Sequence, residues 1–504
     1  MANNFHTADP SHLTLRHRLR FLAKDSILYG GAAAFSRVFS LITFPLLARY
    51  FSVEDFGLID FFTVIAGLLT IFFVFGQDSA VARFFYEYKN KESRSQLISQ
   101  SLVLQISCVV LTLPLLWFIL GQLASKLNNA PESALLLKIV LFQVPFLVLI
   151  NFSQNLLKWT FTRTRFLIIS LGSVIFNVIL LLIAILVFKI DVAGVFLVSL
   201  VTKIFFSLLG LFFIKNWIVL PNGFAFLQKL LPYAIPYGVI CCIGAFVPVL
   251  ERSLVNSLLG EHDLGIYAAG TKIAMLLALV TQAFQMAWGP FSLAIYKEPN
   301  AAQTYNWVLK SFTLGICMAV LFLAAIARPA ILLFASDRYM ESAIIVFPLA
   351  MGLAIQTTSG ITEIGIGLSR KSYLSLYSYV VFLAVIAISI YFLATVYGLL
   401  GVALGVMTGH IVRALIASCL AQYAYPLSWP FGQVLRFIIG TIAIGLFGTW
   451  AGMEISSYAG SVIYTFGVIV LPVTGWFLLF NQNERERIRA ETHSFKVRLL
   501  EYFY

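Results

Sequence analysis

The chain has 504 residues, of which 60% are hydrophobic and only 11% are charged, and its mean hydropathy is +0.92. Soluble domains carry roughly 25% charged residues, so this composition excludes a water-soluble fold. The net charge of +12 would suggest nucleic acid as the partner of a soluble protein, but in a membrane protein the first question is where the basic residues lie relative to the bilayer.

The chain begins with a basic segment, residues 1–25, that leads into a long apolar run. This run is too long for the apolar region of a signal peptide and no small-residue cleavage site follows it, so we expect an anchor that is not removed. The five cysteines all lie in apolar runs without CxxC or Cys/His metal spacing. We therefore interpret them as packing residues and expect neither a metal site nor a cofactor.

Apolar segments long enough to cross a bilayer follow one another along the whole chain. A spanning helix needs about 20 apolar residues. The sequence shows no period-two pattern of a membrane barrel, and a lipid-exposed helix satisfies its own backbone. We predict an all-α polytopic membrane protein with about fourteen transmembrane helices, and 328–342 is either a loop or an interfacial helix. The predicted spans are 26–49, 56–78, 97–120, 134–157, 166–188, 192–214, 233–258, 264–290, 306–326, 343–368, 373–395, 398–422, 433–453 and 457–480.

The basic residues in the connections predict the orientation of these spans. With an even number of spans both termini lie on one side, and that side carries 21 of the Lys and Arg residues in the termini and connections, whereas the opposite side carries four. Because cytoplasmic loops are rich in Lys and Arg, both termini are predicted to be cytoplasmic. Anionic headgroups then account for the net charge, and no nucleic-acid partner is needed. The flanking segments 12–24 and 483–504 mix apolar and charged positions, as interfacial helices do.

A short internal repeat predicts two related halves. The segment from Glu54 to Thr63 matches the segment from His262 to Thr271 at an offset of 208, with a glycine at the same place in both. A second match, Gly194 with Gly401, has an offset of 207. Six spans per half is an even number, so the halves should be parallel repeats, an arrangement that many secondary transporters use for alternating access. The expected organisation is 1–25 basic segment, 26–214 N-lobe, 215–232 cytoplasmic linker, 233–422 C-lobe, 433–480 extra helix pair and 481–504 amphipathic cytoplasmic tail.

Several basic residues fall inside the predicted spans. Arg37 and Lys203 each lie 11 residues into a span, about 16 Å deep at 1.5 Å per residue. Lys272 lies about 12 Å deep by the same rise, and Arg252 is near the outer end of its span. A charge at the midplane is costly and normally faces a bundle interior or a watery cavity. We predict that these four residues bind an anionic substrate such as phosphate or pyrophosphate; alternatively, Arg37 or Lys203 pairs with an acid or a helix C-terminus across the bundle.

Acidic residues and one histidine inside the spans are candidates for coupling to an ion gradient. Asp60, Glu251 and Glu363 are carboxylates within predicted spans, and His410 is an intramembrane imidazole. Such groups can carry protons in transporters. A lone buried histidine can equally be a hydrogen-bonded packing residue.

Enzymatic readings have little support in the sequence. The segment from Gly265 to Lys272 superficially resembles a phosphate loop, but its last two residues are transposed and it opens an apolar helix. No cluster of hydrolytic residues is visible, and the longest connection between spans is about 20 residues, which is short for a glycan polymerase. We therefore expect no enzymatic activity.

The sequence resembles the bacterial polysaccharide flippases, the O-antigen and exopolysaccharide translocases of the multidrug/oligosaccharidyl-lipid/polysaccharide exporter superfamily. The resemblance rests on FSRVFSLITFPLLARYFSVEDFGLIDFFTVIAGLL (35–69), GQDSAVARFFYE (76–87), LPYAIPYGV (231–239) and residues 264–291. It implies two six-helix lobes that flip an undecaprenyl-pyrophosphate-linked oligosaccharide, such as a lipopolysaccharide O-antigen repeat, from the inner to the outer leaflet.

The resemblance also implies roles for particular residues and partners. In similar lipid II flippases a cationic cavity engages the pyrophosphate and the lipid enters between the first and eighth spans, which Arg37 and Lys272 flank by position. Related sodium-linked flippases use polar ligands from spans seven, eleven and twelve, whereas spans eleven and twelve contain no acid here, which favours proton coupling or the membrane potential. Expected partners are membrane lipids and the lipid-linked oligosaccharide, with a polysaccharide polymerase and chain-length machinery.

Two other functions compete with the flippase. A multidrug exporter of the same superfamily should carry acids deep in the first lobe, and span one has none. A membrane polymerase or ligase for the same glycans should carry a long periplasmic loop, which the sequence lacks.

Overall fold

A computed structural model of the protein describes residues 42–127, 131–369, 371, 373–482 and 484–486. Helices account for nearly all of them, and these residues contain no strand, so the predicted all-α class is confirmed. Eleven of their helices are long and apolar enough to cross a membrane, or up to 12 when one bent pair is counted as a single span. The predicted fourteen is compatible with this number. The first predicted span and both terminal segments lie almost entirely outside the described residues.

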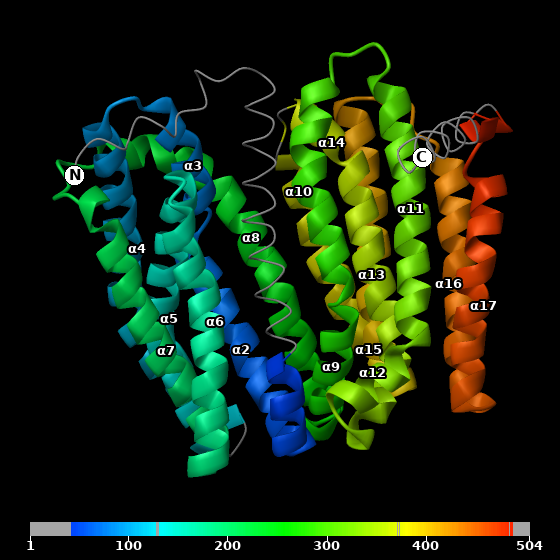
Figure 1. Cartoon of the computed structure of the whole chain (residues 1–504), viewed down its shortest axis with the longest axis horizontal. Helices are drawn as coiled ribbons and strands as arrows, with labels where there is room; N and C mark the ends of the chain where they lie inside the picture. Colours follow the sequence, from blue (N-terminus) through cyan, green and yellow to red (C-terminus); the bar gives the residue numbers. More distant parts are fainter. Residues whose placement is uncertain (1–41, 128–130, 370, 372, 483, 487–504) are drawn as a thin grey trace, which may run out of the picture. The chain divides into compact units, whose positions relative to one another are not determined.

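The first of two compact units runs to Ala268 and includes residues 334–336. Within it, α5 packs against α2, α4, α6 and α7, while α8 packs against α2, α3 and α4 (Figure 1). Its core is made of aliphatic and phenylalanine side chains between these helices. The elements are α2 (Val53–Val74), α3 (Gln77–Glu87), α4 (Lys91–Leu127), α5 (Pro131–Trp159), α6 (Arg163–Ile183) with the π-turn η3 (Ala184–Phe188), α7 (Val192–Ile214), η4 (Lys215–Trp217), α8 (Ala225–Leu258) and the start of α9 (Glu261–Ala274).

The second unit contains residues 269–333 and 337–504. Helix α13 is its centre, because α10, α11, α15 and α16 all pack against it and 78% of its most apolar stretch is buried. The segment 328–342, for which the sequence left a loop or a helix open, is helical. The elements are α10 (Leu277–Ile295), α11 (Ala301–Ala325), α12 (Ala327–Phe334), η5 (Asp337–Ser342), α13 (Ala343–Thr362), α14 (Ile364–Ser369), α15 (Tyr373–Ala424), α16 (Phe431–Glu454) and α17 (Ser457–Leu478).

Helix α15 is two helices joined at Gly398, where the sequence predicts a boundary between spans. Its 52 residues would extend about 78 Å as one helix, more than twice the hydrocarbon core. Gly398 has φ 55° and ψ −133°, a conformation that only glycine adopts without strain. The chain then turns back, so that a Cβ on Gly401 would lie 1.9 Å from the Leu393 carbonyl and one on Gly405 2.7 Å from the Ile390 nitrogen. Small residues here let two helices pack at close range.

Residues that the internal repeat pairs are in direct contact within the first unit. Gly57 and Gly265, which match at the offset of 208, approach so closely that a Cβ on Gly57 would lie 2.6 Å from the Gly265 nitrogen. Glu54 and His262 match at the same offset, and their Oε1 and Nδ1 atoms are 2.8 Å apart. Contact between equivalent residues is what a local two-fold relation between α2 and the start of α9 produces.

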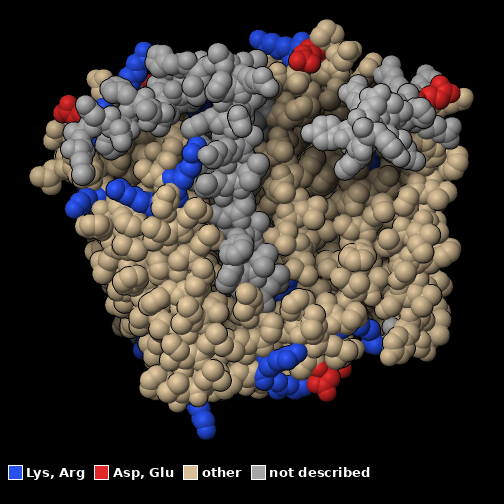
Figure 2. All heavy atoms as spheres, in the orientation of Figure 1, with Lys and Arg blue, Asp and Glu red and all other residues tan. Residues whose placement is uncertain are grey.

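On the surface of the molecule, charged side chains are rare along the middle of the helices. On the face drawn in Figure 2, Lys, Arg, Asp and Glu gather toward the two ends of the helices, and the surface between is almost entirely uncharged. This distribution is the one expected of helices that cross a hydrocarbon layer. The bounds predicted for the two lobes and the linker stay predictions.

Candidate functional site

The first unit buries an ionic cluster around Arg252. Its Nε donates a hydrogen bond of 2.8 Å to Oδ2 of Asp60, and its Nη1 lies 3.6 Å from Oε2 of Glu251. The Tyr267 hydroxyl donates to the same Glu251 oxygen at 2.8 Å. The Arg252 side chain is only 2% exposed. A buried charge is tolerated when it is paired and hydrogen-bonded, and both conditions hold here.

Three helices supply this cluster. Glu251 and Arg252 are consecutive on α8, and Arg252 Nη1 also donates to the Pro248 carbonyl one turn earlier, at 3.3 Å. Asp60 comes from α2, which packs along α8, and Tyr267 comes from the start of α9, with its ring 5.6 Å from the guanidinium carbon. Two carboxylates thus face one guanidinium. Protonation of one carboxylate would weaken its attraction for the guanidinium and leave the other as the stronger partner.

The second unit contains a cluster of the same kind. Arg413 on α15 donates from Nη2 to both oxygens of Glu363, at 3.0 and 3.2 Å, and the Ser359 hydroxyl donates to Oε1 at 2.9 Å. Glu363 lies just after α13 and Ser359 is one turn earlier, so the carboxylate is positioned by the end of the central helix. The Arg413 guanidinium also lies over the Tyr379 ring, 4.3 Å from its centroid. These contacts make a charge-assisted and cation–π site.

His410 lies one turn before Arg413 on α15 and belongs to the same region. Its ring packs on Phe382, with centroids 4.8 Å apart, and against the backbone of α13 at Gly352. Within the described part of the chain, His410 Nδ1 and the Nε and Nη1 atoms of Arg413 have no hydrogen-bond partner. This region therefore combines an ion pair with buried nitrogen atoms whose hydrogen-bonding capacity is not used within the described residues.

Lys203 lies in neither cluster. Its Nζ donates a short hydrogen bond to Oε1 of Gln143 on α5, whose amide in turn donates to the Phe196 carbonyl at 2.6 Å. A neutral amide is a weaker partner for an ammonium than a carboxylate, so the charge of Lys203 is solvated without being neutralised by this contact. Lys203 is half-buried.

The predicted site residues thus separate into groups. Asp60, Glu251 and Arg252 lie together in the first unit, and in this conformation Arg252 is held by protein carboxylates. Glu363 and His410 lie in the second unit on either side of Arg413. Lys272, on α9, belongs to the second unit and is half-buried. Arg37 lies outside the described residues.

Tyr267, Gln143 and Arg413 contact predicted site residues but were not themselves singled out from the sequence as site residues. Arg413 follows His410 by one helical turn, a spacing that places both on one face, and this was the available signal. Tyr267 and Glu251 are 16 residues apart and lie on different helices. No periodicity in the sequence predicts that they pair.

The fold is one that solved membrane transporters share. The structure resembles an inward-facing multidrug resistance MATE family transporter of the MOP superfamily with a TM-score of 0.65, at 17% identity, over 77% of this chain and 94% of that one. It also resembles the lipid II flippase MurJ in an inward closed conformation with a TM-score of 0.56, at 16% identity, over 89% of this chain and 98% of that one. At these identities the likeness is one of fold.

The sequence gives the family. Residues 22–296 match the model of the polysaccharide biosynthesis protein family, and the chain belongs to that family. Two relatives from Haemophilus influenzae are an uncharacterized membrane protein, 26% identical over 58% of this chain and 70% of its own length, and the Lsg locus putative protein 1, 24% identical over 58% and 71%. The resemblance to polysaccharide flippases seen in the sequence is confirmed at the level of the family. The protein is a multi-pass membrane protein.

Proposed function

We propose that this protein is a flippase that moves an undecaprenyl-pyrophosphate-linked oligosaccharide, an O-antigen or exopolysaccharide repeat unit, across the bacterial cytoplasmic membrane by alternating access. The observation that carries the proposal is the family match over residues 22–296, which concerns polysaccharide biosynthesis. A fold shared with a lipid II flippase supports translocation of a lipid-linked saccharide. Both termini are proposed to be cytoplasmic, from the basic residues of the connections.

The anionic part of such a substrate needs basic side chains within the membrane. We assign this role to Arg37, Lys203 and Lys272. Lys203 supports the assignment, because its ammonium is bound to an amide and stays available to a pyrophosphate oxygen. Arg252 joins them only in a conformation in which its bonds to Asp60 and Glu251 are broken.

Coupling is proposed to use protons. Asp60 and Glu251 share one guanidinium in the first unit, and Glu363 is bound to Arg413 beside His410 in the second. Proton uptake by any of these carboxylates would loosen a buried ion pair, and the loosened pair would link a proton gradient to a change of conformation. The substrate is carried without a covalent change.

A multidrug exporter is the second candidate function. It is favoured by the higher TM-score to the MATE family transporter, 0.65 against 0.56 for the lipid II flippase. An exporter of organic cations would use the buried carboxylates themselves as binding groups.

Deletion of the gene in the native host separates the two functions. The flippase proposal expects loss of surface polysaccharide and accumulation of the lipid-linked oligosaccharide in the inner leaflet, restored by the gene in trans. Normal polysaccharide together with increased sensitivity to cationic dyes would overturn it in favour of the exporter. A strain that makes no lipid-linked oligosaccharide serves as the control, since the deletion should then have no effect on the glycan lipid.

A further inference from the structure

A break between α2 and α3 creates a polar pocket inside the first unit. Phe75 and Gly76 both adopt positive φ, 43° and 70°, and end one helix before the next begins. Helix α8 packs directly on this break, since a Cβ on Gly238 would lie 2.7 Å from the Phe75 carbonyl oxygen. The break places Gln77 and Asp78 in the first turn of α3. Interrupted helices with polar termini are typical of binding sites in transporters.

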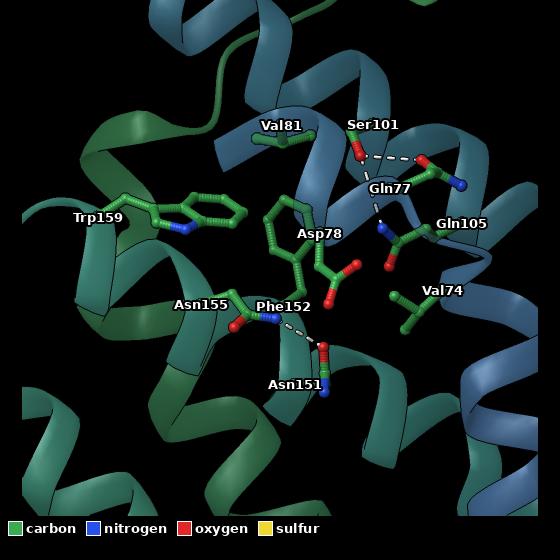
Figure 3. A pocket seen from close by; sticks show the side chains of 10 residues that line it. All are labelled: Val74, Gln77, Asp78, Val81, Ser101, Gln105, Asn151, Phe152, Asn155 and Trp159. Atoms are coloured by element: carbon green, nitrogen blue, oxygen red, sulfur yellow. Dashed lines mark hydrogen bonds between the residues drawn. The ribbon is translucent and has the colours of Figure 1, made fainter. Parts of the chain in front are cut away.

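The pocket is lined by side chains from α3, α4 and α5 and by Val74 at the end of α2 (Figure 3). The space between these side chains is about 190 Å³ only when open solvent is counted with it, and in this conformation it holds no volume for a water-sized molecule. A sugar hydroxyl would therefore reach the polar lining only when these side chains move apart, and a whole oligosaccharide would not enter. The polar lining consists mainly of amides, with one carboxylate and one indole: Gln77, Asp78, Gln105, Asn151, Asn155 and Trp159.

The hydrogen bonds in the pocket leave acceptors facing its space. The Ser101 hydroxyl donates to Gln77 Oε1 at 2.9 Å, and the Asn155 amide donates to Asn151 Oδ1 at 2.8 Å (Figure 3). The Gln105 amide nitrogen donates to Ser101 at 3.5 Å. Gln105 is only 2% exposed, yet its Oε1 has no partner among the described residues. An unpaired buried acceptor is costly, so the pocket is suited to a ligand that donates hydrogen bonds.

The charges around the pocket favour a neutral donor. The Asp78 carboxylate points into the space in Figure 3, and its Oδ1 accepts from the Ser79 backbone at 2.8 Å. Lys158 lies close enough to Asp78 for a Coulomb interaction that partly offsets the carboxylate. The described residues include no group of three His, Cys, Asp or Glu able to hold a metal ion. Hydroxyl groups can donate hydrogen bonds to each of these acceptors, the Asp78 carboxylate included.

The position of the pocket along the helices suits a sugar assembled in the cytoplasm. Trp159 is the last residue of α5, at the end predicted to be cytoplasmic. Asn155 lies one turn and Asn151 about two turns further in, about 12 Å from that end at 1.5 Å per residue.

We propose that this amide pocket binds the hydroxyl groups of one sugar of the lipid-linked substrate, with the apolar face of that sugar against the Trp159 ring. The proposal rests on the proposed function, which supplies a saccharide. It adds a site for the sugar that is separate from the basic residues assigned to the pyrophosphate.

The test measures binding of two probes to the purified full-length protein in lipid nanodiscs. One probe is undecaprenyl pyrophosphate, and the other is the lipid-linked repeat unit extracted from the native host. Wild type should bind the second probe more tightly. Gln105→Leu and Asn155→Leu should each lose about three- to tenfold in affinity for that probe alone, as expected for one hydrogen bond each. Gln105→Glu, which keeps the acceptor, should lose less.

The matched control is Asn177→Leu, which removes an amide of α6 that donates to Thr202 at 3.2 Å in the same unit but outside the pocket. It should leave the preference for the sugar unchanged. Equal loss of affinity for both probes in Gln105→Leu and Asn155→Leu would reduce the pocket to a packing role and overturn the proposal. A second result would also overturn the proposal. If the affinity of the wild type for the sugar probe rose with sodium concentration at fixed ionic strength, and Asp78→Asn abolished that affinity, the pocket would be a cation site. Equal wild-type affinity for the two probes overturns the pocket and leaves the flippase standing, whereas binding of neither probe contradicts the flippase itself.

Discussion

The ion pair between Glu363 and Arg413 is the contact whose energetic role is easiest to isolate. The two side chains are 17% and 4% exposed, and the guanidinium reaches both carboxylate oxygens. Arg413→Met would leave the Glu363 carboxylate buried with only the Ser359 hydroxyl as its partner in the described structure. Glu363→Gln would leave the guanidinium without a counter-charge. Breaking a buried pair from one side costs about 3–5 kcal/mol of unfolding free energy.

The double variant isolates the interaction energy between Glu363 and Arg413. Glu363→Gln with Arg413→Met removes both charges and leaves an amide beside a shorter apolar side chain, so the uncompensated charge that dominates each single loss disappears. The double variant should recover at least about 2 kcal/mol relative to the sum of the singles, within the range of measured coupling energies for residues in one network. The assay is reversible unfolding of purified protein in mixed micelles, with each variant compared at the same detergent composition.

An additive result would refute the reasoning. If the double variant lost as much as the two singles combined, Glu363 and Arg413 would be stabilised by other groups and their contact would carry no energy. The pair Arg83 and Glu87, one helical turn apart and 54% exposed on both sides, is the internal control. Its double-mutant cycle should give little or no coupling energy, because solvent screens exposed charges.

Three further predictions concern transport and topology. Flux of the lipid-linked oligosaccharide into proteoliposomes should survive removal of sodium and fall when the proton gradient is collapsed, because spans 373–395 and 398–422 contain no carboxylate; strict sodium dependence would contradict proton coupling. In a version without the native cysteines, a cysteine in 121–133 should label from the periplasm and one in 89–95 only after permeabilisation, and the reverse pattern would invert the topology. Ala at Arg37, Lys203 or Lys272 should abolish surface polysaccharide at normal expression, and Arg37→Lys should rescue partly because an ammonium lacks the forked donors of guanidinium; full export by Arg37→Ala and Lys272→Ala would remove both from the substrate site.

Much of the fold could be predicted because the bilayer imposes a simple pattern. A run of about 20 apolar residues has few alternatives to a helix in lipid, and α4, α5, α7, α11, α16 and α17 each overlap a predicted span. The boundary at Gly398 was visible because glycine punctuates the apolar run there. The break at Phe75 and Gly76 was not predicted, since the predicted span 56–78 runs through it and α8, which packs on it, lies far along the chain.

The candidate site was predictable as a set of residues but not as an arrangement. A charged residue is easily recognised within an apolar run of the sequence. The candidates Asp60, Glu251, Arg252 and Glu363 were predicted in this way. Their pairing depends on helix packing. Asp60 and Arg252 are 192 residues apart, and their contact exists because α2 and α8 lie along each other. The spacing of residues in the sequence predicts which of them share one face of a helix. It does not predict which other helix packs against that face.

In the amide pocket, too, the sequence does not predict which side chains pair, and here the residues are mostly uncharged. Asn and Gln inside an apolar span cost less than a charge and attract less notice in a hydropathy reading, yet each brings donors and acceptors that must be satisfied once buried. Asn151 and Asn155 satisfy one another along a single helix, as residues four apart can. Gln77 and Gln105 meet through Ser101 only because the break after α2 turns the first residues of α3 toward α4. One acceptor, Gln105 Oε1, is left over by this arrangement. A packing role alone would not require an amide there, since Leu of similar size has no polar atom to satisfy, and this is why we interpret the unpaired acceptor as part of a binding site.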